Sequence, residues 1–249
     1  MNTENITKLA KIVENSKKIV FFGGAGVSTE SGLKDYRSKD GIYNTYNKYG
    51  ISPEEILSID FFNENPKIFY QFYREFFLHN VKPNKAHIAL AKLENSDKKV
   101  TVVTQNVDNL HQLAGSTNVL ELHGTAEKYY CTNCGKSYTK EYIADKSKDI
   151  PYCTGCNDGI VRPVVTLYGE MLDDFVTERA IRAIWEADLL IIGGTSLTVY
   201  PAASFINYFN GPHLVVINKE RTASDSRADL VFHDSIGEVL DAVCKKLEI

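Results

Sequence analysis

Phe21-Phe-Gly-Gly-Ala-Gly-Val-Ser-Thr-Glu-Ser-Gly-Leu-Lys-Asp-Tyr-Arg37 is the stretch that decides the fold. An apolar run over residues 19–22 predicts a buried strand, which leads into glycines at positions 23, 24 and 26. Glycines at a strand end let the backbone turn sharply and approach a ligand closely. Ser28 then offers an N-cap for a short helix, whose free N–H groups favour a phosphate. The stretch therefore indicates a dinucleotide site, although Thr29 stands where a full Gly-x-Gly-x-x-Gly has its third glycine.

An acid and a base, Asp35 and Arg37, follow this turn directly on what we expect to be a loop. Loops carry function disproportionately, so this pair is a candidate for ligand contact. The wider segment 33–50 has little periodicity and carries Tyr43, Tyr46 and Tyr49. A long aromatic loop of this kind predicts a lid that orders over a ligand.

The composition and the net charge of the chain limit the kinds of protein that it can be. The chain has 249 residues, of which 43% are hydrophobic and 24% charged, as in an ordinary globular protein with one sizeable core and a small additional module. The net charge of −4 and the lack of a basic stripe argue against nucleic acid as the main partner. Residues 1–16 lack the apolar core of a signal peptide, and no stretch has the length of a membrane span. We therefore expect a soluble cytoplasmic protein whose five cysteines do not form disulfides.

Six apolar segments are predicted strands, and most are continuous runs, as in a parallel sheet covered on both faces. They are residues 19–22, 100–104, 119–122, 189–192, 214–217 and 230–232. Helical patterns lie around and between them at 3–15, 86–93, 174–187, 202–209 and 236–247. This alternation predicts an α/β fold with a doubly wound, Rossmann-like parallel sheet.

Two regions fall outside the alternation. Residues 61–78 carry eight aromatic side chains at mixed helical spacing, which predicts a helical insert that packs its rings in a core. An apolar tunnel for a substrate is the alternative. Residues 124–162 contain Cys131-x-x-Cys134 and Cys153-x-x-Cys156, a spacing typical of a tetrahedral zinc ribbon. A redox disulfide is the alternative for one lone pair, but four thiolates fill the coordination shell and predict a structural zinc.

Polar turns follow the predicted strands at the edge of the sheet where ligands bind. They are Thr104-Gln-Asn-Val-Asp108, Glu121-Leu-His-Gly124, Gly193-Gly-Thr-Ser196 and Asn218. The hydroxyls of Thr195 and Ser196 suit a phosphate, and Asn218 suits a ribose hydroxyl. His123 is the candidate acid/base, because the pKa of imidazole lies near neutral pH. Asn106 and Asp108 are either ribose ligands or caps of the next helix. His111 is interpreted as a packing residue, and Cys244 as a small buried side chain.

These motifs resemble one family, the sirtuins, which are NAD-dependent protein-lysine deacylases, and in particular the bacterial type. The resemblance is carried by Gly24–Arg37, Thr104-Gln-Asn-Val-Asp-Asn-Leu-His111, Glu121–Gly124, the two cysteine pairs, Tyr168-Gly-Glu170 and Gly194-Thr-Ser-Leu-Thr-Val-Tyr-Pro-Ala202. It implies a discontinuous NAD-binding domain (residues 1–33, 84–123 and 164–249), a cofactor-binding loop with the helical insert (34–83) and a zinc-ribbon module (124–163).

The resemblance also implies the site. His123 and Asn106 would be catalytic, with His123 as general base. NAD would be bound by Gly24, Ala25, Gly26, Thr29, Asp35, Tyr36, Arg37, Gln105, Asn106, Val107, Asp108, Gly194, Thr195, Ser196, Asn218, Lys219 and Ser235. The acetyl-lysine peptide would contact Tyr70, Tyr73, Tyr168, Gly169, Glu170, Leu197 and Val199. Zinc would be held by Cys131, Cys134, Cys153 and Cys156.

The implied reaction consumes NAD. The acyl oxygen attacks the ribose as nicotinamide leaves, and His123 activates a ribose hydroxyl that attacks the resulting alkylimidate. The products are lysine and O-acetyl-ADP-ribose. The substrate would add as a strand between residues 169–170 and 197–200, by β-augmentation. Departures from the family pattern are Lys34, Tyr36, Thr166 and Leu167.

The acyl preference depends on the helical insert. Sirtuins that remove succinyl groups carry Tyr-x-x-Arg there, and the corresponding stretch here begins at Tyr70 and has Tyr73 in place of the arginine. We therefore predict deacetylation rather than desuccinylation. Arg74 keeps the alternative open, because spacings of three and four share a helix face. Protein ADP-ribosylation and a non-catalytic NAD-responsive module are the other functions compatible with the same motifs.

Overall fold

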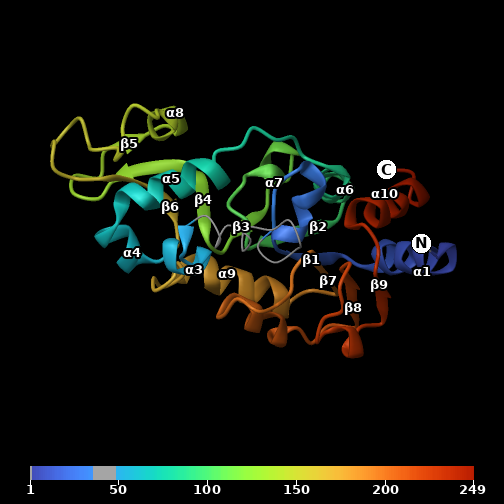
Figure 1. The fold of residues 1–249 in the computed structure, drawn as a ribbon. Coiled ribbons are helices and arrows are strands. Elements are labelled where there is room, and N and C mark those ends of the chain that lie inside the picture. Colours follow the sequence, from blue (N-terminus) through green and yellow to red (C-terminus); the bar gives the residue numbers. More distant parts are fainter. Residues whose placement is uncertain (1, 36–48) are drawn as a thin grey trace.

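A computed structural model describes residues 2–35 and 49–249, and a six-stranded parallel sheet forms its centre (Figure 1). The strand order is β3-β2-β1-β7-β8-β9. The strands are β1 (Lys18–Gly23), β2 (Lys99–Thr104), β3 (Val119–Glu121), β7 (Leu189–Gly193), β8 (His213–Ile217) and β9 (Leu230–Phe232). All six predicted strands are confirmed. The chain runs outward from β1 in both directions, so ligands are expected at the carboxyl end of β1, where the strand order reverses.

Both faces of this sheet are covered, as the continuous apolar strands predict. Ile19 and Phe21 of β1 belong to a core with α1 (Thr3–Asn15), α6 (Lys85–Glu94) and α10 (Ile236–Lys246). Val20 and Phe22 point to the opposite face and pack in a core with α9 (Asp174–Trp185) and the segment 202–208. The predicted helix at 202–209 is a 3₁₀ helix, η4 (Ala202–Tyr208), rather than an α-helix. The doubly wound arrangement is confirmed.

A second, smaller unit lies beside the sheet and contains a three-stranded antiparallel sheet of order β5-β4-β6. Its elements are α3 (Pro53–Ile56), α4 (Ile59–Glu64), α5 (Pro66–Phe76), β4 (Gly124–Cys131), β5 (Ser137–Tyr138), α8 (Lys140–Ala144) and β6 (Val161–Val165). The aromatic rings of α4 and α5 form one core with β4 and β6. Phe69 and Tyr73 stack with ring centroids 5.8 Å apart, and both are buried. The helical insert is therefore a packed core, as predicted.

Two further features of the fold are a short helix beside the sheet and the lengths of the helices. The short helix α7 (Leu110–Leu113) follows β2 directly and lies at its carboxyl end. Among the helices of residues 2–35 and 49–249, none combines the length and the hydropathy that crossing a bilayer requires.

Candidate active site

A cavity of about 740 Å³ opens at the carboxyl ends of β1, β2, β7 and β8, between the large sheet and the smaller unit. Its walls contain most of the residues that the sequence nominates. These are Gly24, Ala25, Gly26, Thr29, Asp35, Gln105, Asn106, Val107, Asp108, His123, Gly194, Thr195, Ser196, Asn218 and Lys219, with Tyr73, Tyr168, Gly169, Glu170 and Val199. Tyr36 and Arg37 lie outside the described residues, as does most of the expected lid.

The glycine turn after β1 fits tightly against the turn after β7. The N–H of Gly26 donates to the carbonyl of Gly194 over 2.8 Å. A Cβ on Gly26 would lie 2.8 Å from the Cα of Gly194, and one on Gly24 would lie 2.9 Å from the Cβ of Thr195. Only glycine allows this approach, which brings bare backbone to the floor of the cavity. Such a cradle fits the phosphates of a dinucleotide.

Ser28 has a different role from the one predicted. It flanks a short 3₁₀ helix, but its hydroxyl makes no capping bond there. Instead the hydroxyl donates to Asp108 Oδ2 over 2.6 Å and accepts from Asn106 Nδ2 over 3.0 Å. Asp108 Oδ1 accepts from the N–H of Leu110 at the start of α7. The glycine turn and the end of β2 are thus joined by one buried hydroxyl, and Asp108 both lines the cavity and fixes α7.

His123 follows β3 and lines the cavity with a half-buried ring. Its Nδ1 lies 3.0 Å from the carbonyl oxygen of Gln105. In the neutral ring Nδ1–H donates to that carbonyl, which leaves the lone pair on Nε2 available to accept a proton. Burial lowers the pKa of His123 below its ordinary value of 6.5, although the bond to Gln105 opposes the shift. The imidazole is therefore neutral at pH 7, as a general base requires.

The far side of the cavity is polar and hydroxyl-rich. Gln105 Nε2 donates to Thr195 Oγ1 over 3.1 Å, which links the ends of β2 and β7. Asn218 lines the cavity and donates from Nδ2 to the carbonyl of Glu220. Ser235 does not line it. The Ser235 hydroxyl donates to Glu30 Oε1 and accepts from the N–H of Glu238, so it caps α10.

The segment after β6 supplies the opposite wall. Glu170 accepts two hydrogen bonds from the buried guanidinium of Arg162, over 2.7 and 2.8 Å, and a third from the N–H of Leu167. Burial alone would raise the pKa of Glu170, but these bonds outweigh it and lower the pKa. The carboxylate therefore holds the loop 167–170 in place. Tyr168 pairs with the chain at Ser58, which ties the loop to the helical insert.

The side chains that bear on acyl preference lie in different places. Tyr70 is fully buried outside the cavity, and its hydroxyl donates to the carbonyl of Val161. Tyr73 lines the cavity. Arg74 points into the smaller unit, where its guanidinium donates to the carbonyls of Ile143, Lys148 and Asp149. Leu197 also lies outside the cavity wall and packs on the core beside α9.

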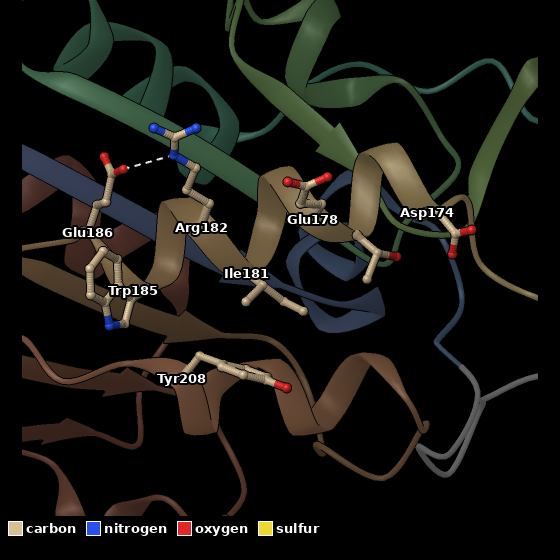
Figure 2. Close-up of a pocket in the computed structure, with 8 residues that line it drawn as sticks. Asp174, Glu178, Ile181, Arg182, Trp185, Glu186 and Tyr208 are labelled. Carbon is tan, nitrogen blue, oxygen red and sulfur yellow. Dashed lines mark hydrogen bonds and ion pairs between the residues drawn. The ribbon is translucent and has the colours of Figure 1, made fainter.

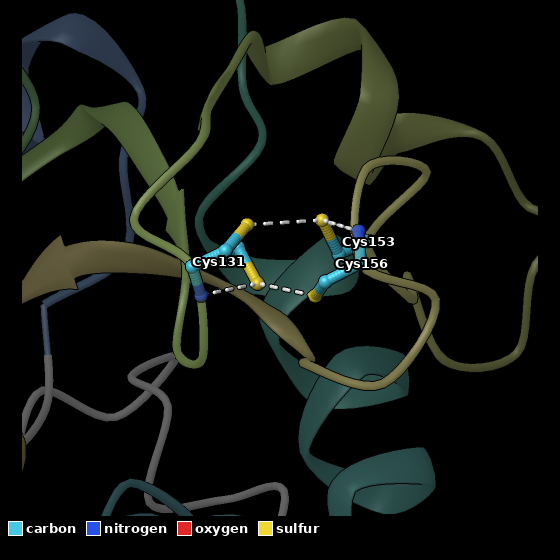
Figure 3. Close-up of side chains that lie close together, drawn as sticks. Cys131, Cys153 and Cys156 are labelled. Atoms are coloured by element: carbon cyan, nitrogen blue, oxygen red, sulfur yellow. Dashed lines mark hydrogen bonds between the residues drawn. The ribbon is translucent and has the colours of Figure 1, made fainter.

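Four thiols converge in the smaller unit, as the spacing predicts (Figure 3). The Sγ atoms of Cys131, Cys134, Cys153 and Cys156 all lie within 4.8 Å of one another, and two of the pairs are 3.6 Å apart. Four thiolates at about 2.3 Å from one zinc would be about 3.8 Å apart, so the donor set fits a tetrahedral zinc. Backbone N–H groups from residues 133, 134, 155 and 156 point at two of the sulfurs. Such donors stabilise thiolates, so they also fit a metal centre.

His111 and Cys244 are packing residues, as interpreted from the sequence, and His87 packs beside His111. The rings of His87 and His111 lie in the interior with their centroids 4.6 Å apart and their planes tilted by 59°. Burial lowers the pKa of His87 to about 4 and that of His111 to about 3, so neither ring is charged at neutral pH. Cys244 is buried in α10 beside α6.

Sequence reasoning missed the part of the cavity wall that the smaller unit supplies. The missed residues include Phe76, Phe77, His79, Asn80, Val81, Ala126, Glu127 and Lys140. It also missed Asp234 and Ile236, the neighbours of Ser235, and Glu220 and Arg221 after Asn218. For Asp234 a signal was present, because it follows the sixth strand in the way that Asn218 follows the fifth.

Comparison with known proteins places the fold and the cavity in one family. The model of the Sir2 family matches residues 24–201, which is more than half of the chain. The NAD-dependent protein deacetylase of Clostridium acetobutylicum is 53% identical over 241 residues, which cover 96% of this chain and 98% of the relative.

Two solved structures are also similar. A Sir2 histidine-to-alanine variant with deacetylated p53 peptide and 3′-O-acetyl ADP ribose has a TM-score of 0.90 and 38% identity, and covers 97% of this chain and 98% of that one. A Sir2 complex with p53 peptide and NAD⁺ has a TM-score of 0.87 and 37% identity over 98% of each chain. This protein therefore belongs to the Sir2 family.

Proposed function

We propose that this protein is an NAD-dependent protein-lysine deacetylase that transfers the acetyl group to ADP-ribose and releases nicotinamide. The observation that carries the proposal is the placement of His123. Its Nδ1 is held by the Gln105 carbonyl, and its ring lines the cavity formed by the polar strand ends. The similar proteins support the same reaction, since one is an NAD-dependent deacetylase and another holds an O-acetyl ADP ribose.

The chain's own residues suggest how NAD would be held as co-substrate. The glycine turn and Thr195 would contact the phosphates, and Asn218 the adenine ribose. Asn106 and Asp108, held in place by Ser28, would contact the nicotinamide ribose. Asp35, Tyr36 and Arg37 would contribute further contacts to NAD. Zinc, held by the four cysteines, would supply structure alone, because four thiolates leave no open position.

His123 would act after nicotinamide has left. The acetyl oxygen of the peptide attacks the ribose carbon, and nicotinamide departs with the electron pair of its bond. Nε2 of His123 then takes the proton of a ribose hydroxyl, whose oxygen attacks the acetyl carbon. Water completes the release of lysine and O-acetyl-ADP-ribose. A carbonyl oxygen is a weak nucleophile, so the walls of the cavity must align it and exclude solvent.

The peptide would lie as an added strand between the loop at 169–170 and the segment 197–200. The ion pair of Glu170 with Arg162 keeps the first loop in position for this role. We also propose the division into an NAD-binding domain (1–33, 84–123, 164–249), a loop with helical insert (34–83) and a zinc-ribbon module (124–163). The helical insert and the zinc-ribbon module share one aromatic core, which supports their separation from the NAD-binding domain. Cytoplasmic localisation is part of the same proposal.

The direct test is incubation of the protein with an acetyl-lysine peptide, with and without NAD. We expect release of nicotinamide, loss of acetyl from the peptide and appearance of O-acetyl-ADP-ribose in equal amounts, measured by mass spectrometry. The reaction should require NAD. Transfer of ADP-ribose onto the peptide, or acetyl loss without nicotinamide release, would contradict the proposal.

Acetyl-lysine is expected to be preferred over succinyl-lysine by about 100-fold in kcat/KM, because Tyr73 stands where succinyl-removing sirtuins carry the arginine that pairs with the acyl carboxylate. Tyr73 occupies the cavity wall, and the guanidinium of Arg74 is engaged by three carbonyls elsewhere. The measurement is competition between two peptides that differ only in the acyl group. Arg74→Lys should leave the ratio unchanged. Comparable turnover of the two peptides would contradict the predicted preference. A selective loss of succinyl turnover in Arg74→Lys would show that Arg74 contacts the acyl chain.

A further inference from the structure

A groove of about 780 Å³ runs along α9 and shares no lining residue with the main cavity (Figure 2). Figure 2 shows Ile181 and Trp185 of α9 on the side that faces Tyr208 of η4. Trp185 is 58% exposed and Tyr208 is 51% exposed. Large exposed aromatic side chains that flank a groove are typical of binding surfaces. Trp185 is also the only tryptophan in the chain.

The two helices that form the groove follow the walls of the proposed peptide site along the chain. One wall of that site, the loop at 169–170, leads within four residues into α9. The other wall, the segment 197–200, leads directly into η4. The groove is formed by these same two helices. A chain bound as a strand between the two loops would therefore run on into the groove at one of its ends.

The groove is acidic at its near end. Asp174, Glu178, Arg182 and Glu186 follow each other at intervals of four and form one stripe along α9. Glu186 already pairs with Arg182 and Lys18, each over 3.0 Å. None of the ion pairs in the described part of the chain uses Asp174 or Glu178. Glu178 lies close enough to Arg182 to help raise the pKa of that guanidinium, but neither Asp174 nor Glu178 is held in an ion pair with a described residue, so both carboxylates can attract a basic side chain at the amino end of α9.

We propose that the α9–η4 groove is a second binding site for the substrate protein, and that it takes an extended segment carrying lysine or arginine and then an apolar side chain. This inference rests on the proposed deacetylase function. The basic side chains would meet Asp174 and Glu178, and the apolar one would pack on Trp185 and Tyr208. Charge complementarity of this kind selects partners, and the aromatic contact adds affinity.

The length of the groove along α9 sets the number of residues between the basic and the apolar side chain of the bound segment. Asp174 and Trp185 are eleven residues apart on α9, which corresponds to about 16 Å at the rise of an α-helix. An extended chain covers that distance in about five residues. The segment should thus place its basic residue about five positions before or after its apolar one. Whether it precedes or follows the acetyl-lysine is decided by the direction in which the peptide lies.

Binding is tested with tryptophan fluorescence. The probes are two tryptophan-free peptides with glutamine in place of acetyl-lysine, so that no turnover takes place. One carries a ten-residue extension with two arginines and a leucine on its amino side, and the other carries it on its carboxyl side. We expect one of them to change the emission of Trp185 saturably. Asp174→Asn with Glu178→Gln should weaken this binding about tenfold, as should 0.5 M salt.

The matched control removes two carboxylates from another helix. Asp60 and Glu64 are exposed, lie four residues apart on α4 and do not line the groove. Asp60→Asn with Glu64→Gln should leave binding unchanged. If neither extended peptide changes the emission, or if both double variants weaken binding equally, the groove is not the site.

The KM and kcat of short and extended peptides distinguish the second binding site from the deacetylase function on which it rests. With acetyl-lysine peptides, the correct extension should lower KM about tenfold at unchanged kcat, and Asp174→Asn with Glu178→Gln should remove that gain. The same variant should turn over a short peptide like the unmodified protein. Equal KM for short and extended peptides would overturn the second site and leave the deacetylase proposal standing. No turnover of any peptide would overturn the function, and the fluorescence titration would still decide the groove.

Discussion

Alanine in place of His123 is expected to lower the kcat of deacetylation by about 10²- to 10⁴-fold, with NAD bound almost as tightly as before. The loss follows from the position of the ring, whose Nδ1 is fixed by the Gln105 carbonyl while Nε2 is left to accept a proton. Departure of nicotinamide does not use this base in the proposed reaction. Exchange of labelled nicotinamide into NAD should therefore survive in His123→Ala when acetyl transfer is lost.

The pH profile follows from the same residue. Because burial lowers the pKa of His123 below 6.5, most of the imidazole is neutral at pH 7, and the neutral form is lost as the pH falls through that lowered value. We expect kcat/KM to be level near neutrality and to decline on the acid side below pH 6.5. This acid limb should disappear from the residual activity of His123→Ala.

His213→Gln is the matched control, since His213 is a partly exposed histidine outside the cavity. It should keep full activity and the same pH profile. An unaltered rate in His123→Ala would reject a catalytic role for this histidine. A loss of NAD binding equal to the loss of rate would make it a binding residue instead.

Removal of zinc is expected to abolish activity and unfold the smaller unit while the six-stranded sheet persists. The antiparallel sheet of that unit is small, and its β5 strand has only two residues. A structural zinc supplies about 10–16 kcal/mol to a unit of this kind. Ala126, Glu127 and Lys140 of the cavity wall belong to the same unit, so the channel would lose one side.

Cys131→Ser and Cys153→Ser test this expectation, with zinc content measured by atomic emission and structure by hydrogen exchange. Each should lose the metal, the activity and the protection of β4 and β6. Cys244→Ala is the control, because Cys244 lies in α10 apart from the four-thiol cluster. It should retain one zinc per chain. Full activity in a zinc-free variant would rule out the structural role.

Local patterns were enough to predict the framework. Continuous apolar runs mark strands buried on both faces, and each of the six ran where the periodicity placed it. The cysteine spacing likewise predicted the four-thiol cluster, because the coordination of zinc restricts the geometry of its ligands. Polar residues after the strands pointed to the cavity, since the ends of parallel strands meet at one edge.

What the sequence did not reveal depends on contacts between distant segments. Ser28 looked like a helix cap, and only the fold brings it to Asp108 and Asn106. Helical spacing could not separate Tyr70, Tyr73 and Arg74, because three- and four-residue intervals share a face. The three side chains have different surroundings because the smaller unit packs on that face. Its carbonyl groups accept hydrogen bonds from Arg74. The cavity wall at residues 76–81 gave no motif at all.

The contact of Gly26 with Gly194 ties the cofactor site to the order in which the chain is synthesised. β1 sits between β2 and β7, yet β7 leaves the ribosome only after the whole smaller unit has been made. Until then, one edge of β1 has no partner strand, and the glycine turn lacks its contact with Gly194. A nascent chain that ends before β7 would expose an apolar strand edge, which favours association with other chains.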